Sequence, residues 1–300
     1  MIALDQDLAQ QLLEQTIAVQ LNTRSFGNTK KLNREAHNVA AQALRAAPKR
    51  LKTSEVLIDP SMEEFAAVTS HMSRIRDWFD KQTIPSQQPA IRFLHRDKLP
   101  QFQRDIESFI RQLRDLVYEL DNVRYRIIDS ARMELRDAFQ EDLYPLSFSD
   151  SYAIDVSYPA VGPDPRLQAL NPDVYAEQQR RFISQIDVII QETTDEMSQQ
   201  FSHILNQVTE SIREGRRLKS NAFDPLCNFL ERFENIKIGT STTLQEMVNQ
   251  ARQIVNQHST YSSLNHSAVA RSNVANALAP LAEQINSIVT TTPTIRAIKL

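Results

Sequence analysis

Glycine is scarce in this chain, with only 4 among 300 residues. Globular proteins average about 7% glycine, and β-sandwiches, barrels and glycine-rich nucleotide-binding folds depend on it for turns and close backbone approaches. The shortage therefore argues against all of these classes. Glutamine, arginine, glutamate, leucine and alanine are plentiful instead, and these residues favour helices. We expect a mainly α-helical protein.

Cysteine is nearly absent, and long apolar runs are missing. Cys227 is the single cysteine, so neither an intramolecular disulfide nor a cysteine-based zinc site can form. Its neighbours Leu226, Phe229 and Leu230 predict that it lies in the core. The sequence has no apolar run of about 18 residues and no signal-peptide pattern at its start. We expect no membrane span and a cytoplasmic location.

Signatures of catalysis and of cofactor binding are also missing. The six histidines include no pair four residues apart and no H-E-x-x-H motif, which disfavours a metal site. The stretch "SFGNTKK" has one glycine, Gly27, and no Ser or Thr after its lysines, so it does not match a phosphate-binding loop. We interpret it as a turn that needs positive φ at Gly27 or Asn28. The sequence thus predicts no enzyme activity, no cofactor and no metal.

The net charge of −3 conceals a basic segment at residues 24–52. Its only acid is Glu35, and the local charge is +7. The basic residues are Arg24, Lys30, Lys31, Arg34, Arg45, Lys49, Arg50 and Lys52. Three interpretations stay open: a solvated or intramolecularly paired face, a site for an acidic protein partner, or a site for nucleic-acid phosphates. Phe26 is the only aromatic residue available there to stack on bases, so nucleic acid is favoured less than protein.

The strongest helical pattern begins near Pro100. Apolar residues recur at alternating spacings of three and four, which is the a/d pattern of a coiled coil. We call these residues the seam: Ile106, Phe109, Leu113, Leu116, Leu120, Val123 and Ile127. The helix should reach Gln140, a length of about 60 Å at 1.5 Å per residue. A helix this long with one apolar stripe needs a partner helix.

The segment that follows is rich in proline, and a second long helix comes after it. "SYAIDVSYP" alternates apolar and polar residues, which indicates a short strand or an extended arm. The second helix is expected from Asp173 to about Lys219. Because the two long helices have similar lengths, we expect them to form an antiparallel, coiled-coil-like hairpin.

Three domains are therefore expected. Residues 1–98 should hold N-terminal helices with the basic segment. The first helix is expected at 2–22 and a basic helix near 30–47. A third helix, capped by Ser61 and Glu64, should run to about Lys81, before a connector at 82–98. Residues 99–220 should form the long hairpin with its proline-rich loop at 144–172. Residues 221–300 should form short helices at 223–233, at 243–258 (with a Thr243/Glu246 capping box) and at 266–289 (with a kink or a break at Pro280).

Several landmarks together resemble a known family. They are "RSFGNTKKLN", "RFLHRDKLPQF", "LYP", "VSYP", "FDPLCNFLERFENIKIG" and "TTLQEMVNQARQIV". The order of these segments resembles a bacterial and phage family catalogued only as a domain of unknown function, number 3150. Family members often carry a tryptophan near the position of Phe26, and this chain departs from them there. The resemblance implies no established activity and no catalytic residues.

The genes of that family often lie near those of MoxR-type AAA+ ATPases and von Willebrand A-type proteins. The resemblance therefore implies an adaptor, phage-encoded in some cases, that serves an ATPase assembly in the host cytoplasm. A second hypothesis is a virion or other structural component in which copies of the chain pack together as a homo-oligomer. A third is a nucleic-acid-binding protein that uses residues 24–52.

Overall fold

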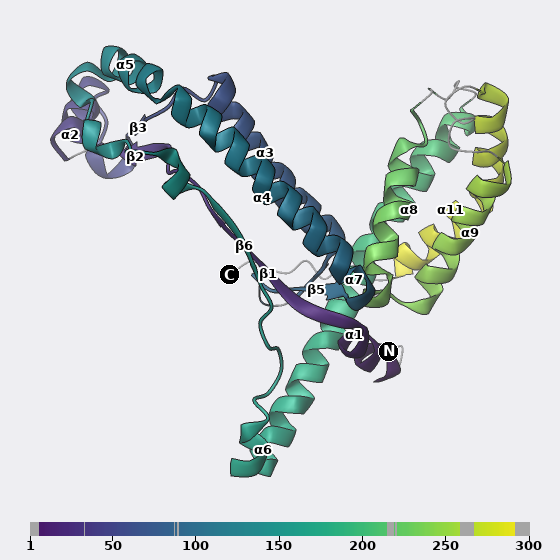
Figure 1. The fold of residues 1–300 in the computed structure, drawn as a ribbon. Coiled ribbons are helices and arrows are strands. Elements are labelled where there is room, and N and C mark those ends of the chain that lie inside the picture. Colours follow the sequence, from purple (N-terminus) through teal and green to yellow (C-terminus); the bar gives the residue numbers. More distant parts are fainter. Residues whose placement is uncertain are drawn as a thin grey trace. The chain divides into compact units, whose positions relative to one another are not determined.

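A computed structural model of the chain describes residues 6–32, 34–86, 88, 90–214, 219, 221–258 and 267–291. The fold is mainly helical, with a small antiparallel sheet (Figure 1). The chain divides into two compact units. The first unit contains Met1–Val19, Asp80–Lys98 and Tyr158–Leu300, and the second contains Gln20–Phe79 and Leu99–Ser157. None of the helices in the described ranges is long and apolar enough to cross a membrane.

The N-terminal segment is only half helical. Helix α1 spans Gln6–Gln15, and strand β1 spans Thr16–Arg24, so the predicted helix at 2–22 is wrong in its second half. The sequence "TIAVQLNTR" begins with β-branched residues, which lose side-chain freedom in a helix and pack well in a strand. Antiparallel partners on its two sides, β5 and β6, complete the change from helix to strand.

The sheet has the strand order β4-β5-β1-β6. In the first unit, β1 pairs with β5 (Arg92–His95) from Thr16↔His95 to Val19↔Arg92, and β4 (Ile84–Pro85) lies beside β5. In the second unit, β1 pairs with β6 (Ala153–Ser157) from Gln20↔Ser157 to Arg24↔Ala153. The strand predicted inside the proline-rich loop is thus confirmed as β6. The predicted connector at 82–98 contains two of the four strands.

The second unit is organised around two antiparallel helices that lie side by side, α3 (Glu63–Gln82) and α4 (Leu99–Asn122) (Figure 1). The Nε2–H of His71 donates to the Phe109 carbonyl at 2.9 Å. Nearer the end of α3, Trp78 stacks on Phe102 with ring centroids 5.0 Å apart. These contacts pack α3 along the apolar face of α4.

The seam is therefore buried, but not in the predicted way. Its buried members are Ile106, Leu113, Leu120 and Ile127, and its half-buried members are Phe109, Leu116 and Val123. Phe102 and Val117, which lie outside the predicted seam, are also buried. The helix is interrupted at Val123, where φ is −100° and ψ is 8°, and it continues as α5 (Arg124–Leu135). The predicted helix to Gln140 is thus two shorter helices.

The first unit contains the second long helix, α7 (Pro172–Arg213), close to its predicted position. Its C-terminal half packs against α8 (Asp224–Ile236) and α11 (Ala268–Thr291), and α9 (Thr242–His258) packs against α11 in the same core. Phe201 stacks on Phe229 at 5.2 Å, and Asn206 and Asn286 exchange side-chain hydrogen bonds of 2.9 and 3.0 Å. The structure does not show the predicted hairpin, because α4 and α7 belong to different units and each buries its apolar face within its own unit.

The predicted C-terminal helices are confirmed, with Pro280 inside α11. The cap of α9 differs from the prediction, because the Leu244 N–H donates to Ser241 Oγ. At the start of α3, the Ser61 hydroxyl donates to the carboxylate of Asp59 at 2.8 Å. The two units do not follow the predicted segments 1–98, 99–220 and 221–300, since each unit is assembled from separate stretches of the chain.

Candidate interaction surface

The basic segment forms a small ribbon-and-helix motif in the second unit. Strands β2 (Thr29–Lys31) and β3 (Ser54–Val56) pair antiparallel, and helix α2 (Arg34–Ala43) and the 3-10 turn η1 (Pro48–Arg50) lie between them in the chain. The predicted basic helix at 30–47 is therefore wrong for Lys30 and Lys31, which lie in a strand. The motif places seven of the eight predicted basic residues on β2, on α2, on η1 and on the turns that join them, and Arg24 lies outside it at the end of β1.

Asn28 stabilises the end of this ribbon by hydrogen bonds. Its side chain donates to the Ile58 carbonyl at 2.8 Å and accepts the Ile58 N–H at 2.6 Å, while its own carbonyl accepts the Leu57 N–H at 2.9 Å. These bonds explain why the segment after it is a strand. Neither Gly27 nor Asn28 has positive φ, so the predicted positive-φ turn is wrong. The asparagine is the structural residue of the "SFGNTKK" landmark.

His37 connects α2 to the turn that carries three of the cations. Its Nε2 lies 3.0 Å from the Pro48 carbonyl oxygen, and its Nδ1 lies 2.7 Å from Thr53 Oγ1. A carbonyl oxygen can only accept, so Nε2 carries the hydrogen in this arrangement. Both ends of the 48–53 stretch are thereby fixed to α2, which holds the backbone of Lys49, Arg50 and Lys52 in place.

The cations of residues 24–52 point into solvent. All eight are exposed: Arg24, Lys30, Lys31, Arg34, Arg45, Lys49, Arg50 and Lys52. Among the described residues, no carboxylate forms a salt bridge with any of them. Among the described residues these cations therefore make no salt bridge, although the charge of Lys30 acts on Glu55 across the ribbon. We call these eight residues the basic surface.

Arg45 has an unusual backbone conformation. It ends α2 with φ at 51°, in the left-handed region. The Ala46 N–H donates to the Ala41 carbonyl at 2.8 Å, and the Arg45 N–H donates to the Gln42 carbonyl at 3.0 Å. This is the Schellman pattern, whose left-handed position is usually glycine because a side chain there costs about 1 kcal/mol. An arginine in this place is a local strain.

Glu55 is the acidic residue that lies beneath the basic surface. It pairs with Lys30 across the ribbon, is only 6% exposed, and its Oε2 has no hydrogen-bond partner among the described residues. Burial raises the pKa of Glu55, and the charge of Lys30 lowers it by a smaller amount. The nearby Tyr144 hydroxyl donates to the Leu57 carbonyl at 2.7 Å. Burial, with a contribution from the charge of Glu55, raises the pKa of Tyr144 to about 12.

Aliphatic side chains are exposed on the same motif. Val39 is 60% exposed, Leu44 67% and Val56 45%. Phe26, the aromatic residue of the basic segment, is half-buried and lies edge-on against Phe148, with centroids 5.3 Å apart. It is therefore packed against the protein instead of being presented to a base. The exposure of these aliphatic residues could not be predicted from the sequence, because an apolar residue in a polar segment is compatible with burial and with exposure alike.

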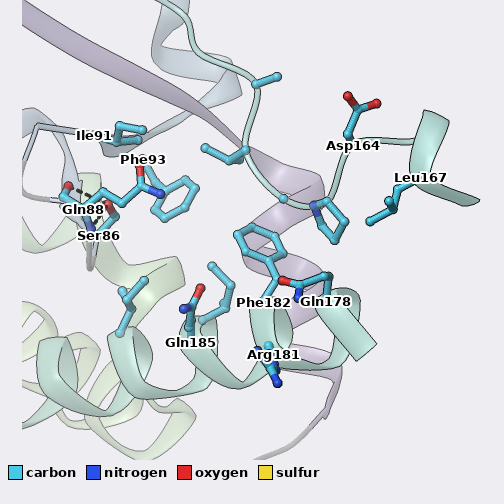
Figure 2. A pocket seen from close by; sticks show the side chains of 16 residues that line it. Ser86, Gln88, Ile91, Phe93, Asp164, Leu167, Gln178, Arg181, Phe182 and Gln185 are labelled. Carbon is cyan, nitrogen blue, oxygen red and sulfur yellow. Dashed lines mark hydrogen bonds between the residues drawn. The ribbon is translucent and has the colours of Figure 1, made fainter. Parts of the chain in front are cut away.

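The first unit contains a separate cavity of about 580 Å³, between α7 and the proline-rich loop (Figure 2). Gln178, Phe182 and Gln185 of α7 line it, with Ser86 and Gln88 across the opening. The loop approaches α7 closely at Gly162, where φ is 98° and an added Cβ would lie 3.3 Å from the Phe182 ring.

The cavity lining is mostly apolar side chains and neutral amides. Its charged members have partners of their own, since Arg181 pairs with Glu177 and Asp164 with Arg166. It could hold an uncharged or weakly polar group. The sequence prediction missed this cavity, and Gly162 in a proline-rich loop was its only sign.

The described residues contain no group of three or more His, Cys, Asp or Glu side chains that could hold a metal ion. Cys227 is buried in α8, as predicted. Comparisons of the chain with protein-family models, curated proteins and solved structures gave no match. The basic surface is thus the feature with the clearest functional chemistry.

Proposed function

We propose that this protein is a non-enzymatic interaction protein whose basic surface binds an acidic surface of a protein partner. One observation carries the proposal: eight cations are exposed along residues 24–52, seven of them on the ribbon-and-helix motif and Arg24 at the end of β1, without a salt bridge to any described carboxylate. Such an array attracts a partner of opposite charge, which raises the rate of association and fixes orientation. The attraction reaches about 8 Å at physiological salt.

The exposed aliphatic side chains favour protein over nucleic acid as the partner. Val39, Leu44 and Val56 offer apolar contact area beside the cations, as protein interfaces do. Helix α2 carries one cation, Arg34, at its first residue and no other along its length, so it does not resemble a basic helix for the major groove. The packing of Phe26 against Phe148 also argues against base stacking.

The strain at Arg45 supports a role in binding. Residues held in unfavourable backbone conformations cluster at functional sites, and glycine at the position of Arg45 would be more stable. Arg45 is exposed, and none of the salt bridges among the described residues includes it. We infer that its charge contributes to the partner site.

The wider setting is also a proposal. The resemblance to the family of unknown function, with its MoxR-type AAA+ neighbours, supports an adaptor role in the cytoplasm of a bacterial cell or a phage-infected host. A virion or other structural component made of packed copies is the alternative. The covering of the seam by α3 favours the adaptor, because α4 then has no long apolar stripe left to pair with another copy.

Site-specific photocrosslinking in the cell of origin tests the proposal. A photoreactive amino acid at Leu44, beside the cations, should crosslink to an acidic protein. Leu170, 82% exposed in the first unit, is the control position. Reversal of Lys49, Arg50 and Lys52 to glutamate should abolish the crosslink from Leu44. Crosslinks from Leu44 to nucleic acid, or a protein crosslink that survives the charge reversal, would reject the proposal.

A further inference from the structure

The β2–β3 ribbon leaves backbone groups unpaired at its edges. The Leu57 N–H donates to the Asn28 carbonyl, and the Leu32 N–H donates to the Thr53 carbonyl. In an antiparallel pair, hydrogen-bonded and non-hydrogen-bonded residue pairs alternate. With the observed register, Lys30↔Glu55 is hydrogen-bonded, whereas Thr29↔Val56 and Lys31↔Ser54 are not. The backbone N–H and C=O groups of those four residues therefore point outward, away from the ribbon.

Nothing in the described part of the chain uses these outward groups. The backbone groups of Thr29 and Lys31 make no hydrogen bond to a described residue outside the ribbon, and the side chains of both residues are exposed. Proteins usually cover or disrupt such edges, because an unpaired strand edge readily accepts another strand. A short ribbon with open edges is therefore ready for strand addition.

We propose that an extended acidic segment of the partner adds to the β2 edge as a third strand. This inference rests on the proposed function and specifies how the basic surface would hold its partner. The β2 edge is chosen over the β3 edge because of charge. Strand β2 carries Lys30 and Lys31, both exposed, whereas β3 carries the acidic Glu55. An acidic strand is attracted to the first edge more than to the second.

The register predicts the composition of the added strand. Its residues beside Thr29 and Lys31 would exchange backbone hydrogen bonds with them, as in peptide recognition by β-augmentation. On the outer face of the ribbon, an acidic side chain would meet Lys31. An aliphatic side chain two residues away would lie beside Thr29, whose cross-strand neighbour is the exposed Val56. The ligand class is an extended segment with acidic and aliphatic residues.

Proline substitution separates strand addition from simple charge attraction. Lys31→Pro removes the outward N–H without removing a ribbon hydrogen bond, and Lys31→Gln removes only the charge. Ser54→Pro makes the same backbone change on the β3 edge. Thr29→Pro is a second variant on the β2 edge, to be used if Lys31→Pro does not keep the circular dichroism spectrum and thermal midpoint of the wild type.

Two probes are needed: an end-blocked peptide of the repeat Glu-Ser-Val-Ser, which places glutamate and valine alternately along one face of the strand (the alternating peptide), and poly-L-glutamate as a charge-only ligand. Fluorescence anisotropy should show that Lys31→Pro lowers the affinity for the alternating peptide at least about tenfold more than Lys31→Gln does. Ser54→Pro should bind this peptide with the affinity of the wild type. Both Lys31 variants should bind poly-L-glutamate equally. The alternating peptide with all its amides N-methylated should bind wild type no better than poly-L-glutamate.

Strand addition would be overturned if Lys31→Pro and Lys31→Gln bound the alternating peptide equally well and still bound poly-L-glutamate. The proposed function would be left intact by that result. The same holds if Ser54→Pro is the variant that loses binding. Failure of wild type to bind either acidic probe would overturn both the inference and the proposed function.

Discussion

Lys30 and Glu55 face each other across the β2–β3 ribbon, with the lysine exposed and the carboxyl group buried. Burial raises the pKa of Glu55 more than the charge of Lys30 lowers it. The folded protein therefore holds this proton more tightly than the unfolded chain does. Ionised Glu55 therefore lowers the stability of the fold at neutral pH. This destabilisation decreases as the pH falls through the pKa of Glu55 in the folded state towards its pKa in the unfolded chain.

We expect Glu55→Gln to raise the thermal midpoint at pH 7. The difference from wild type should shrink as the pH falls through the raised pKa of Glu55, because the wild-type carboxyl group then becomes neutral as well. Glu35→Gln, an exposed acid on α2, is the matched control and should change little. A less stable Glu55→Gln protein at pH 7 would mean that attraction to Lys30 outweighs the burial of the charge.

The seam gives a graded stability prediction. Leu120 is fully buried, Leu116 is half-buried and Gln112 is exposed, all on α4. Leu120→Ala should lower the free energy of unfolding by about 2–5 kcal/mol, because it leaves a cavity against its neighbours. Leu116→Ala should cost clearly less, and Gln112→Ala should lie within about 0.5 kcal/mol of wild type. Urea denaturation measures all three, and equal effects at 116 and 120 would contradict the packing described for α4.

Gly239 lies close to the side chain of Ile84. A Cβ atom there would lie 3.0 Å from Cγ2 of Ile84, which is buried in the first unit. Gly239→Ala should therefore destabilise the protein by about 1–3 kcal/mol through overpacking. Gly27→Ala is the control, because no atom lies within 4 Å of its added Cβ and its φ is not positive. If the Gly239→Ala protein had the same thermal midpoint as the wild type, the contact with Ile84 would be looser than described.

Arg45 should show opposite effects on stability and on binding. Arg45→Gly relieves the left-handed strain and should stabilise the fold by up to about 1 kcal/mol. The same change removes one cation from the basic surface, so binding to poly-L-glutamate should weaken. Arg45→Ala loses the charge but keeps the strain, and separates the two effects. An Arg45→Gly protein that is more stable and binds as wild type does would remove Arg45 from the site.

The sequence was sufficient for the long, strongly periodic helices. Helices α7, α8, α9 and α11 were predicted because their apolar residues repeat over many turns. The partner of the seam was not predictable, because an apolar stripe indicates that something covers it but not which helix. The contacts that decide this, such as Trp78 on Phe102, join residues whose proximity no local pattern reveals.

Short strands and the details of the site were harder to predict. The alternation in 2–22 fits a helix locally, and only pairing with β5 and β6, far along the chain, makes its second half a strand. The eight cations were identified from composition alone, since charge predicts exposure. Their support, the Asn28 bonds and the His37 contacts with Pro48 and Thr53, depends on tertiary structure and left no pattern in the sequence.

The most direct test of the central claim compares acidic polypeptide with duplex DNA as ligands of the basic surface. Fluorescence anisotropy titrations at about 150 mM salt should show binding of poly-L-glutamate that is lost in the Lys49, Arg50 and Lys52 to glutamate variant. The fold of that variant should be intact, because exposed charges contribute only about 0–1 kcal/mol each. Duplex DNA should bind no more tightly than the non-specific range of about 10⁻⁴–10⁻⁶ M. Submicromolar DNA binding that the charge reversal abolishes, without binding of poly-L-glutamate, would contradict the account and identify a nucleic-acid-binding protein.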